Sequence, residues 1–185
     1  MKKSIFFSLL ILLTGSTVIF SSCSKNDEGM ATRLTLYDSL GGTTLVKDPT
    51  SSTVMIEQGR LGIRSVVDST IFVIAADPKL NGFFKVLLAE VTAGNTSGFA
   101  ELSKNLTDLF CAATGSKNFT YAGDDMVTAH DPAKNPRMNG KAATTDFDQF
   151  ITDLVAGAKK NKLPDNLIGS VGAIVNTLRG QVVQK

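Results

Sequence analysis

Apolar residues recur at helical spacing in four long segments of the chain. In residues 59–74 they fall at positions i, i+3, i+4 and i+7 and onward, and Asp77-Pro78 ends the pattern. A second stripe covers residues 99–113. The third and fourth begin at Thr145-Asp146 and Pro164-Asp165, which are residue pairs that favour a helix start. Alternating strand patterns are scarce, so the sequence predicts an all-α fold with four long helices.

The segments between these helices are less regular. Residues 34–40 can form two helical turns that Gly41-Gly42 would close. Residues 43–55 are expected to form a loop around Asp48-Pro49. The stretch 115–145 has little periodicity, so we expect it to be poorly ordered.

The N-terminus is typical of an exported chain. Residues 1–22 combine a basic start with an apolar run that is too short and too interrupted to span a membrane, so they are read as a lipoprotein signal peptide. The run ends in Phe20-Ser21-Ser22-Cys23, which resembles a bacterial lipobox with Phe20 in place of the usual leucine. We expect Cys23 to be lipidated, residues 23–33 to form the anchor and tether, and residues 34–185 to form one domain. An ordinary secretory signal followed by a free cysteine is the alternative.

Charge and cysteine content narrow the possible partners. Removal of residues 1–22 takes away two of the 19 basic residues and none of the 17 acidic ones, so the mature chain is neutral. Nucleic acid is therefore not an expected partner, and membrane contact is expected through the lipid anchor only. With Cys23 acylated, Cys111 is the one remaining thiol, and a metal site with several Cys or His ligands is excluded.

His130 is the only histidine, and it lies just before the helix-ending pair Asp131-Pro132. A lone histidine in a polar loop is commonly a solvated surface residue. Here, however, two apolar helices precede it and two follow it. Such an arrangement can enclose a flat hydrophobic cofactor.

Several motifs, in order, resemble the truncated haemoglobins of the first group. This resemblance implies a two-over-two helical sandwich and a haem cofactor over residues 34–185. The motifs are LYDSLGG (36–42), SVVDST (65–70), ADPKLNGFF (76–84), FTYAGDDMVTAH (119–130) and DFDQFITDLV (146–155).

On this resemblance, His130 is the proximal ligand of haem b, which is iron protoporphyrin IX. Met126, one turn earlier, would pack below the porphyrin, and Tyr121 would lie near the propionates. Further haem contacts are expected from apolar residues, for which plain core packing is the alternative role: Ile71, Phe84, Leu102, Leu106 and Phe110.

The sequence departs from the family pattern on the distal side. Ile71 stands where group-one members usually carry a tyrosine, and Leu102 stands at the polar distal position. Neither side chain can donate a hydrogen bond, which leaves Thr70 and Asn105 as polar candidates. The connection 131–143 is also longer than usual and adjoins His130, so we expect it to bear on the position of the ligand.

These features predict an envelope-anchored haem protein that reversibly binds O2, CO or NO in an apolar distal pocket, with a redox partner as a further possibility. It faces the periplasm or the exterior, and we do not expect it to be an enzyme. The first alternative is a haem enzyme such as a nitric oxide dioxygenase or peroxidase. The second is a degenerate globin without haem that acts as an envelope binding lipoprotein.

Overall fold

The computed structural model describes residues 34–185. The predicted signal peptide (1–22), the lipidated Cys23 and the tether up to residue 33 lie outside the described residues. Among residues 34–185, no helix is both long enough and apolar enough to cross a membrane.

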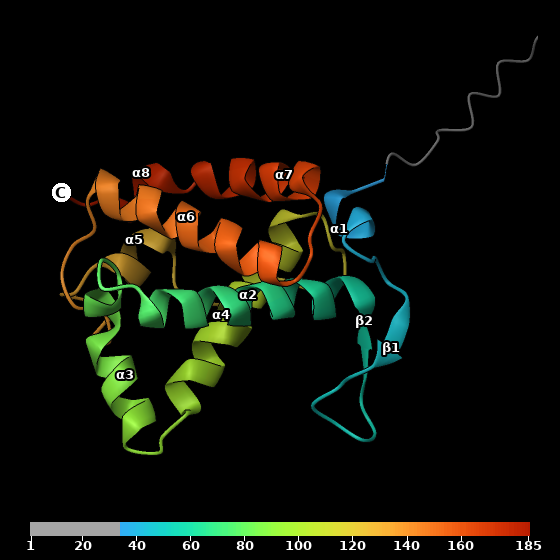
Figure 1. Ribbon diagram of the computed structural model, residues 1–185, viewed down its shortest axis with the longest axis horizontal. Helices are drawn as coiled ribbons and strands as arrows, with labels where there is room; N and C mark the ends of the chain where they lie inside the picture. The colour runs from blue at the N-terminus through green and yellow to red at the C-terminus, as the bar shows by residue number, and fades with distance from the viewer. Residues whose placement is uncertain (1–33) are drawn as a thin grey trace, which may run out of the picture. The chain divides into compact units, whose positions relative to one another are not determined.

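Four long helices form two packed pairs, as the hydrophobic pattern predicts (Figure 1). Helix α2 (Gln58–Ala76) packs against α4 (Ser97–Ala113), and α6 (Thr144–Lys160) packs against α7 (Asp165–Asn176). The pairs meet where α2 contacts α6. The prediction of an all-α, two-over-two architecture is confirmed.

Shorter elements fill the connections. The described part of the chain contains helices α1 (Leu36–Ser39), α3 (Lys85–Thr92), α5 (Met126–His130) and α8 (Arg179–Val182), the 3-10 helix η1 (Asn81–Phe84), and strands β1 (Leu45–Lys47) and β2 (Met55–Glu57). The segment 43–55, predicted to be a loop, contains β1 and the first residue of β2, and residues 48–54 between the paired strands form a loop around Asp48-Pro49 as predicted. Its strands have three residues each, which is too few for alternation to be recognised in the sequence.

The last apolar stripe is divided between two helices instead of forming one helix to Val182. The amide of Thr177 donates to the carbonyl of Ile174 at 3.1 Å, and that of Leu178 donates to Val175 at 2.9 Å. The Thr177 hydroxyl also donates to the Ile174 carbonyl, at 2.6 Å. These tight turns end α7 before α8 begins, although the apolar period continues through them.

Helix α2 lies at the centre of the core. Its buried residues Ile63, Val67 and Ile71 pack with residues of α4, α6 and α7. Phe147 and Leu154 of α6 are 2% and 3% exposed. The Asp146 carboxylate accepts a hydrogen bond from the Ala143 amide at 2.7 Å and so fixes the start of α6.

The helices α2 and α6 cross in close contact at Gly157. A Cβ atom on Gly157 would lie 2.8 Å from the amide nitrogen of Thr70 and 2.9 Å from its Cα, and it would collide with the Thr70 hydroxyl. Only a residue without a side chain allows this approach. Gly157 therefore sets the distance between the two helix pairs.

Replacing Gly157 with Ala should lower the free energy of unfolding by about 1–3 kcal/mol, because the backbone of α2 must move away. For a domain of this size, the melting temperature should fall by about 2–4 °C per kcal/mol. Gly169→Ala on α7 is the matched control, since a Cβ there meets no atom within 4 Å. It should raise stability by up to about 1 kcal/mol. Equal melting temperatures for Gly157→Ala and the unaltered protein would show that the helices are not held this closely.

Candidate functional site

The segment around His130 forms a single helical turn with defined ends. The Asp125 carboxylate accepts hydrogen bonds from the Thr128 amide at 3.0 Å and from the Thr128 hydroxyl at 2.7 Å, which caps the start of α5. At the other end, Asp131 has an extended backbone, and Pro132 follows it. His130 is thus fixed at the last position of α5.

The imidazole of His130 is oriented by its own helix. Its Nδ1 atom lies 2.8 Å from the carbonyl oxygen of Met126. A carbonyl only accepts hydrogen bonds, so Nδ1 carries the proton and Nε2 keeps its lone pair. Burial lowers the pKa of His130, although the bond to Met126 acts in the opposite direction. The ring is therefore neutral at pH 7, with Nε2 available as a metal ligand.

The long segment 131–143 is tied down by polar contacts, and α5 keeps its helical geometry beside it. Asn135 donates to the carbonyl of Ala129 at 2.8 Å, within α5. Asn139 donates to the carbonyl oxygens of Gly82 at 2.8 Å and Phe83 at 3.0 Å, in η1. The segment thus connects α5 to η1 and limits their relative movement.

Arg137 fixes the same segment to two further helices. Its guanidinium pairs with Glu90 of α3 at 3.2 Å and with Glu101 of α4 at 2.9 Å. Sequence reasoning did not identify Arg137 or Asn139. The only local signal was Asn139-Gly140, which is typical of a turn.

The predicted apolar contacts come from several elements. Ile71 on α2 and Phe110 on α4 are each 7% exposed and belong to the main core. Leu102 and Leu106 on α4 are half-buried and pack against that core. Phe84 lies half-buried at the end of η1.

Two of the remaining predicted residues precede His130 in the chain. Met126 begins α5 and is 9% exposed. Tyr121 lies in the loop before α5, and its hydroxyl donates to the carbonyl of Asp124 at 2.6 Å. The structure therefore joins Met126 directly to His130, whereas Tyr121 is bonded locally within its loop.

The polar distal candidates differ in how far their side chains are engaged. The hydroxyl of Thr70 donates to the Val66 carbonyl at 2.8 Å and faces Gly157, so its proton is already used. Asn105 is half-buried on α4. Lys104, also on α4, pairs with Asp108 at 2.7 Å.

Cys111 on α4 is fully buried as a free thiol. Burial raises the pKa of this thiol to about 11. A reactive thiolate is therefore not available at neutral pH, which agrees with the role of a small packing residue.

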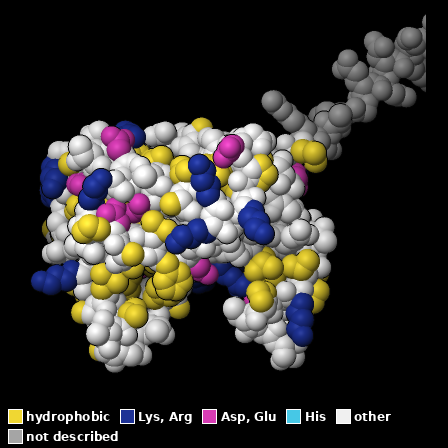
Figure 2. Space-filling view, in the orientation of Figure 1, with side chains coloured by type: hydrophobic (Ala, Val, Ile, Leu, Met, Phe, Trp, Pro, Cys, Tyr) yellow, Lys and Arg dark blue, Asp and Glu magenta, His cyan; other side chains and the backbone are white. Residues whose placement is uncertain are grey.

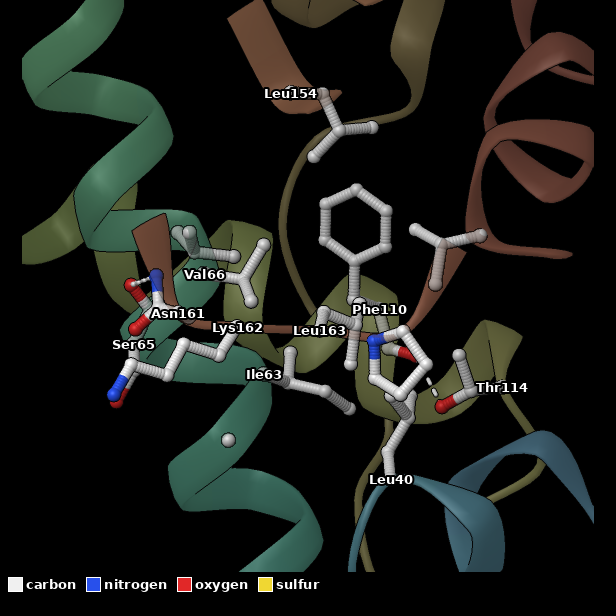
Figure 3. Close-up of a pocket in the computed structure, with 14 residues that line it drawn as sticks. Leu40, Ile63, Ser65, Val66, Phe110, Thr114, Leu154, Asn161, Lys162 and Leu163 are labelled. Carbon is white, nitrogen blue, oxygen red and sulfur yellow. Dashed lines mark hydrogen bonds between the residues drawn. The ribbon is translucent and has the colours of Figure 1, made fainter. Parts of the chain in front are cut away.

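An apolar cavity of about 320 Å³ lies elsewhere in the domain (Figure 3). It is lined by residues of α2, α4, α6 and α7 and of the turns that follow α1 and α6. Phe110 lines this cavity, whereas His130 does not. The cavity walls include Ile63, Val66, Leu154, Leu163 and Val171. The cavity is thus separate from the Nε2 atom that could bind a metal.

No protein-family model matches this sequence, and no curated protein matches it either. Among solved structures, the truncated haemoglobin from Tetrahymena pyriformis, in its Fe(III) form, aligns at 20% identity and a TM-score of 0.58. The 2/2 haemoglobin from Synechococcus sp. PCC 7002, in the cyanomet state with covalently attached haem, aligns at 21% identity and a TM-score of 0.57. Each alignment covers 82% of this chain and 100% of the other. This chain therefore has the fold of the truncated, two-over-two haemoglobins.

Proposed function

We propose that this protein binds haem b through His130 and reversibly binds a diatomic gas, O2, CO or NO, at the iron. In this proposal the domain is attached by a lipid on Cys23 to a membrane of the bacterial envelope. Such a haem protein needs no catalytic residue, although a redox partner that exchanges electrons with the iron is compatible with it.

The observation that carries the proposal is the hydrogen bond from His130 Nδ1 to the Met126 carbonyl, 2.8 Å long. A haem ligand must be a neutral imidazole with one nitrogen free and the other held by an acceptor. His130 meets these three requirements within a fold that is shared with truncated haemoglobins. A bound haem would supply an iron centre able to take a diatomic ligand.

Apolar side chains that are only half-buried support the fit. Leu102, Leu106 and Phe84 keep part of their surface outside the core. Each square ångström of such surface covered by a flat cofactor would contribute about 25 cal/mol to binding. Covalent haem attachment through a Cys-x-x-Cys-His motif is excluded, because the cysteines are Cys23 and Cys111. Non-covalent haem b is therefore the form we propose.

The distal residues favour gas binding over catalysis. Ile71 and Leu102 have no hydrogen-bond donor, and the Thr70 hydroxyl is bonded to its own helix. Peroxide cleavage benefits from a distal base, and oxygen activation benefits from distal polarity. An apolar distal side instead suits carbon monoxide and nitric oxide, which depend less than oxygen on a hydrogen bond.

The envelope location rests on the N-terminal sequence. Residues 1–22 have the basic start and short apolar run of an export signal, and Phe20-Ser21-Ser22-Cys23 resembles a lipobox. Residues 24–33 are mostly polar and would connect the anchor to the domain. Mass spectrometry of the N-terminal peptide would establish the lipid directly.

Replacing His130 with Gly should abolish the normal Soret band of the protein expressed with haem available, because the axial nitrogen is lost. Free imidazole in the millimolar range should restore the wild-type band by occupying the space that the side chain leaves. Absorption spectra of the oxidised, reduced and CO-treated forms measure this. Imidazole added to the unaltered protein is the control. A colourless wild-type protein that also takes up no added haemin would instead establish the haem-free alternative.

The single histidine should titrate below its usual pKa of 6.5 in protein prepared without haem, because its half-buried ring is partly removed from water. In the unfolded chain the imidazole takes up a proton near pH 6.5, whereas in the folded chain it does so only at a lower pH. The stability present above pH 6.5 should therefore decrease as the pH falls through the folded-state pKa. NMR of the ring and unfolding curves between pH 7 and 5 measure both effects. His130→Gln should remove this part of the pH dependence, and a pKa at or above 6.5 would contradict the buried, neutral ring.

Replacing Leu102 with Gln should slow oxygen dissociation by about tenfold to a hundredfold, since a hydrogen bond to a partly charged acceptor contributes roughly 1–3 kcal/mol. Stopped-flow displacement of oxygen by carbon monoxide measures the rate. Leu102→Met is the matched control, because it keeps the volume but adds no donor. Equal rates for the two variants would mean that Leu102 does not face the bound gas.

A further inference from the structure

The β1–β2 hairpin carries apolar side chains on its outer face. The register pairs Leu45 with Glu57 and Lys47 with Met55, so these four residues share one face. Leu45 is 61% exposed and Met55 is 53% exposed. Val54, just before β2, is 52% exposed. The opposite face points inward, with Ile56 buried.

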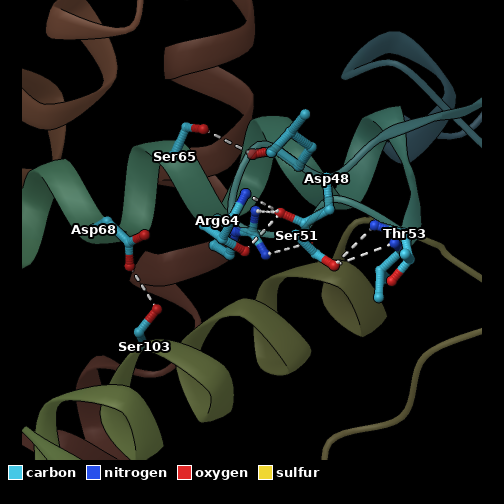
Figure 4. A network of polar contacts seen from close by, with 10 residues as sticks. Asp48, Ser51, Thr53, Arg64, Ser65, Asp68 and Ser103 are labelled. Atoms are coloured by element: carbon cyan, nitrogen blue, oxygen red, sulfur yellow. Dashed lines mark hydrogen bonds and ion pairs between the residues drawn. The ribbon is translucent and has the colours of Figure 1, made fainter.

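The hairpin is held rigidly by a polar network (Figure 4). The Asp48 carboxylate, 6% exposed, accepts two hydrogen bonds from Arg64 of α2, at 2.9 and 2.8 Å. The same carboxylate accepts from the amide and the hydroxyl of Thr50, at 2.9 and 2.7 Å. Arg64 holds the pKa of Asp48 well below its usual range, so this ion pair persists at mildly acidic pH. The outer face is therefore presented in a fixed direction.

Leu45 and Met55 lie on this face beside Lys47 and Glu57, so the face combines two large exposed apolar side chains with two charged ones. In the space-filling view, hydrophobic side chains gather on the lobe that the hairpin forms (Figure 2). Such a patch is typical of a contact with another molecule or with a membrane.

The hairpin lies at the end of the domain where the described chain begins. Leu34, the first described residue, leads into α1, and Figure 1 shows α1, β1 and β2 at the same end of the domain. The C-terminus lies at the opposite end of the domain. Ten residues separate Cys23 from Leu34, and a chain of that length spans at most about 35 Å. A lipid on Cys23 would therefore keep this end of the domain near the membrane.

We propose that the outer face of the hairpin, on which Leu45 and Met55 are exposed, lies in the lipid interface of the membrane that carries the anchor. The hairpin is then a second, non-covalent membrane contact, and it gives the tethered domain a defined orientation. This inference rests on the lipid-anchor part of the proposed function and is independent of haem binding.

The charge of the protein indicates what kind of contact this is. The mature chain is neutral, so attraction to anionic lipids does not drive it. Burial of apolar side chains drives the contact instead. The long stem of Lys47 can lie along the same interface with its ammonium group in water. The contact should therefore form on zwitterionic phosphatidylcholine vesicles as well as on vesicles that contain phosphatidylglycerol.

The test places a nitroxide label on the full, lipidated chain reconstituted in phosphatidylcholine vesicles. Leu45→Cys and Met55→Cys carry the label on the hairpin. Gln181→Cys, on the exposed surface of α8 at the far end of the domain, is the matched control. Cys111 is fully buried and should not react with the label. Power-saturation EPR then compares collisions with oxygen, which concentrates in lipid, and with a water-soluble nickel chelate.

We expect at least a threefold higher oxygen-to-nickel collision ratio at Leu45 and Met55 than at Gln181, with and without phosphatidylglycerol. Equal ratios at the three sites would overturn the proposal. A hairpin label that becomes inaccessible to both reagents, with a second copy detected by cross-linking, would overturn it in favour of self-association. If Cys23 carries no acyl group, both this proposal and the proposed lipid anchor are overturned. The Soret band of the same samples reports separately on haem binding.

Discussion

The close crossing of α2 and α6 at Gly157 is the contact on which the remaining architecture depends. It allows the backbone of Thr70 to approach α6 without an intervening side chain. Helix α2 can then pack on α4, α6 and η1 at the same time. Ile71, the next residue, is buried as a result. The hairpin continues directly into the other end of α2, so its direction is fixed by the same central helix.

The chemistry of the site follows from a local bond placed inside this framework. Asp125 and Pro132 set the ends of one helical turn, and that turn orients His130 through the Met126 carbonyl. The surrounding chain contributes burial, which keeps the imidazole neutral. In the proposed haem site, the distal side would contribute Ile71 and Leu102, which carry no polar atom in their side chains. Such a combination is suited to holding a metal centre with an apolar coordination site, and it gives little support for acid–base catalysis.

Long apolar periodicity predicts the helices correctly, whereas features that depend on single hydrogen bonds or ion pairs are not predicted by the sequence. The four long helices were predicted because each repeats its pattern over at least three turns. The break near Thr177 was missed, because a hydroxyl bond to Ile174 ends α7 without changing the hydrophobic period. His130 stood out as the sole histidine, but the direction of its ring depends on a hydrogen bond that no pattern records. The sequence did not indicate the ion pairs of Arg137, because its partners Glu90 and Glu101 are distant from it in the chain.

The bond between His130 and Met126 also bears on the order in which such a protein is assembled. It joins residues one turn apart, so the imidazole is oriented once the five residues of α5 are helical. That short helix is held by its packing in the domain, here against α8, and not by a cofactor that organises the chain around itself. In the proposed haem protein, the cofactor would then be loaded after folding. If the chain is exported as proposed, this order would separate translocation from maturation.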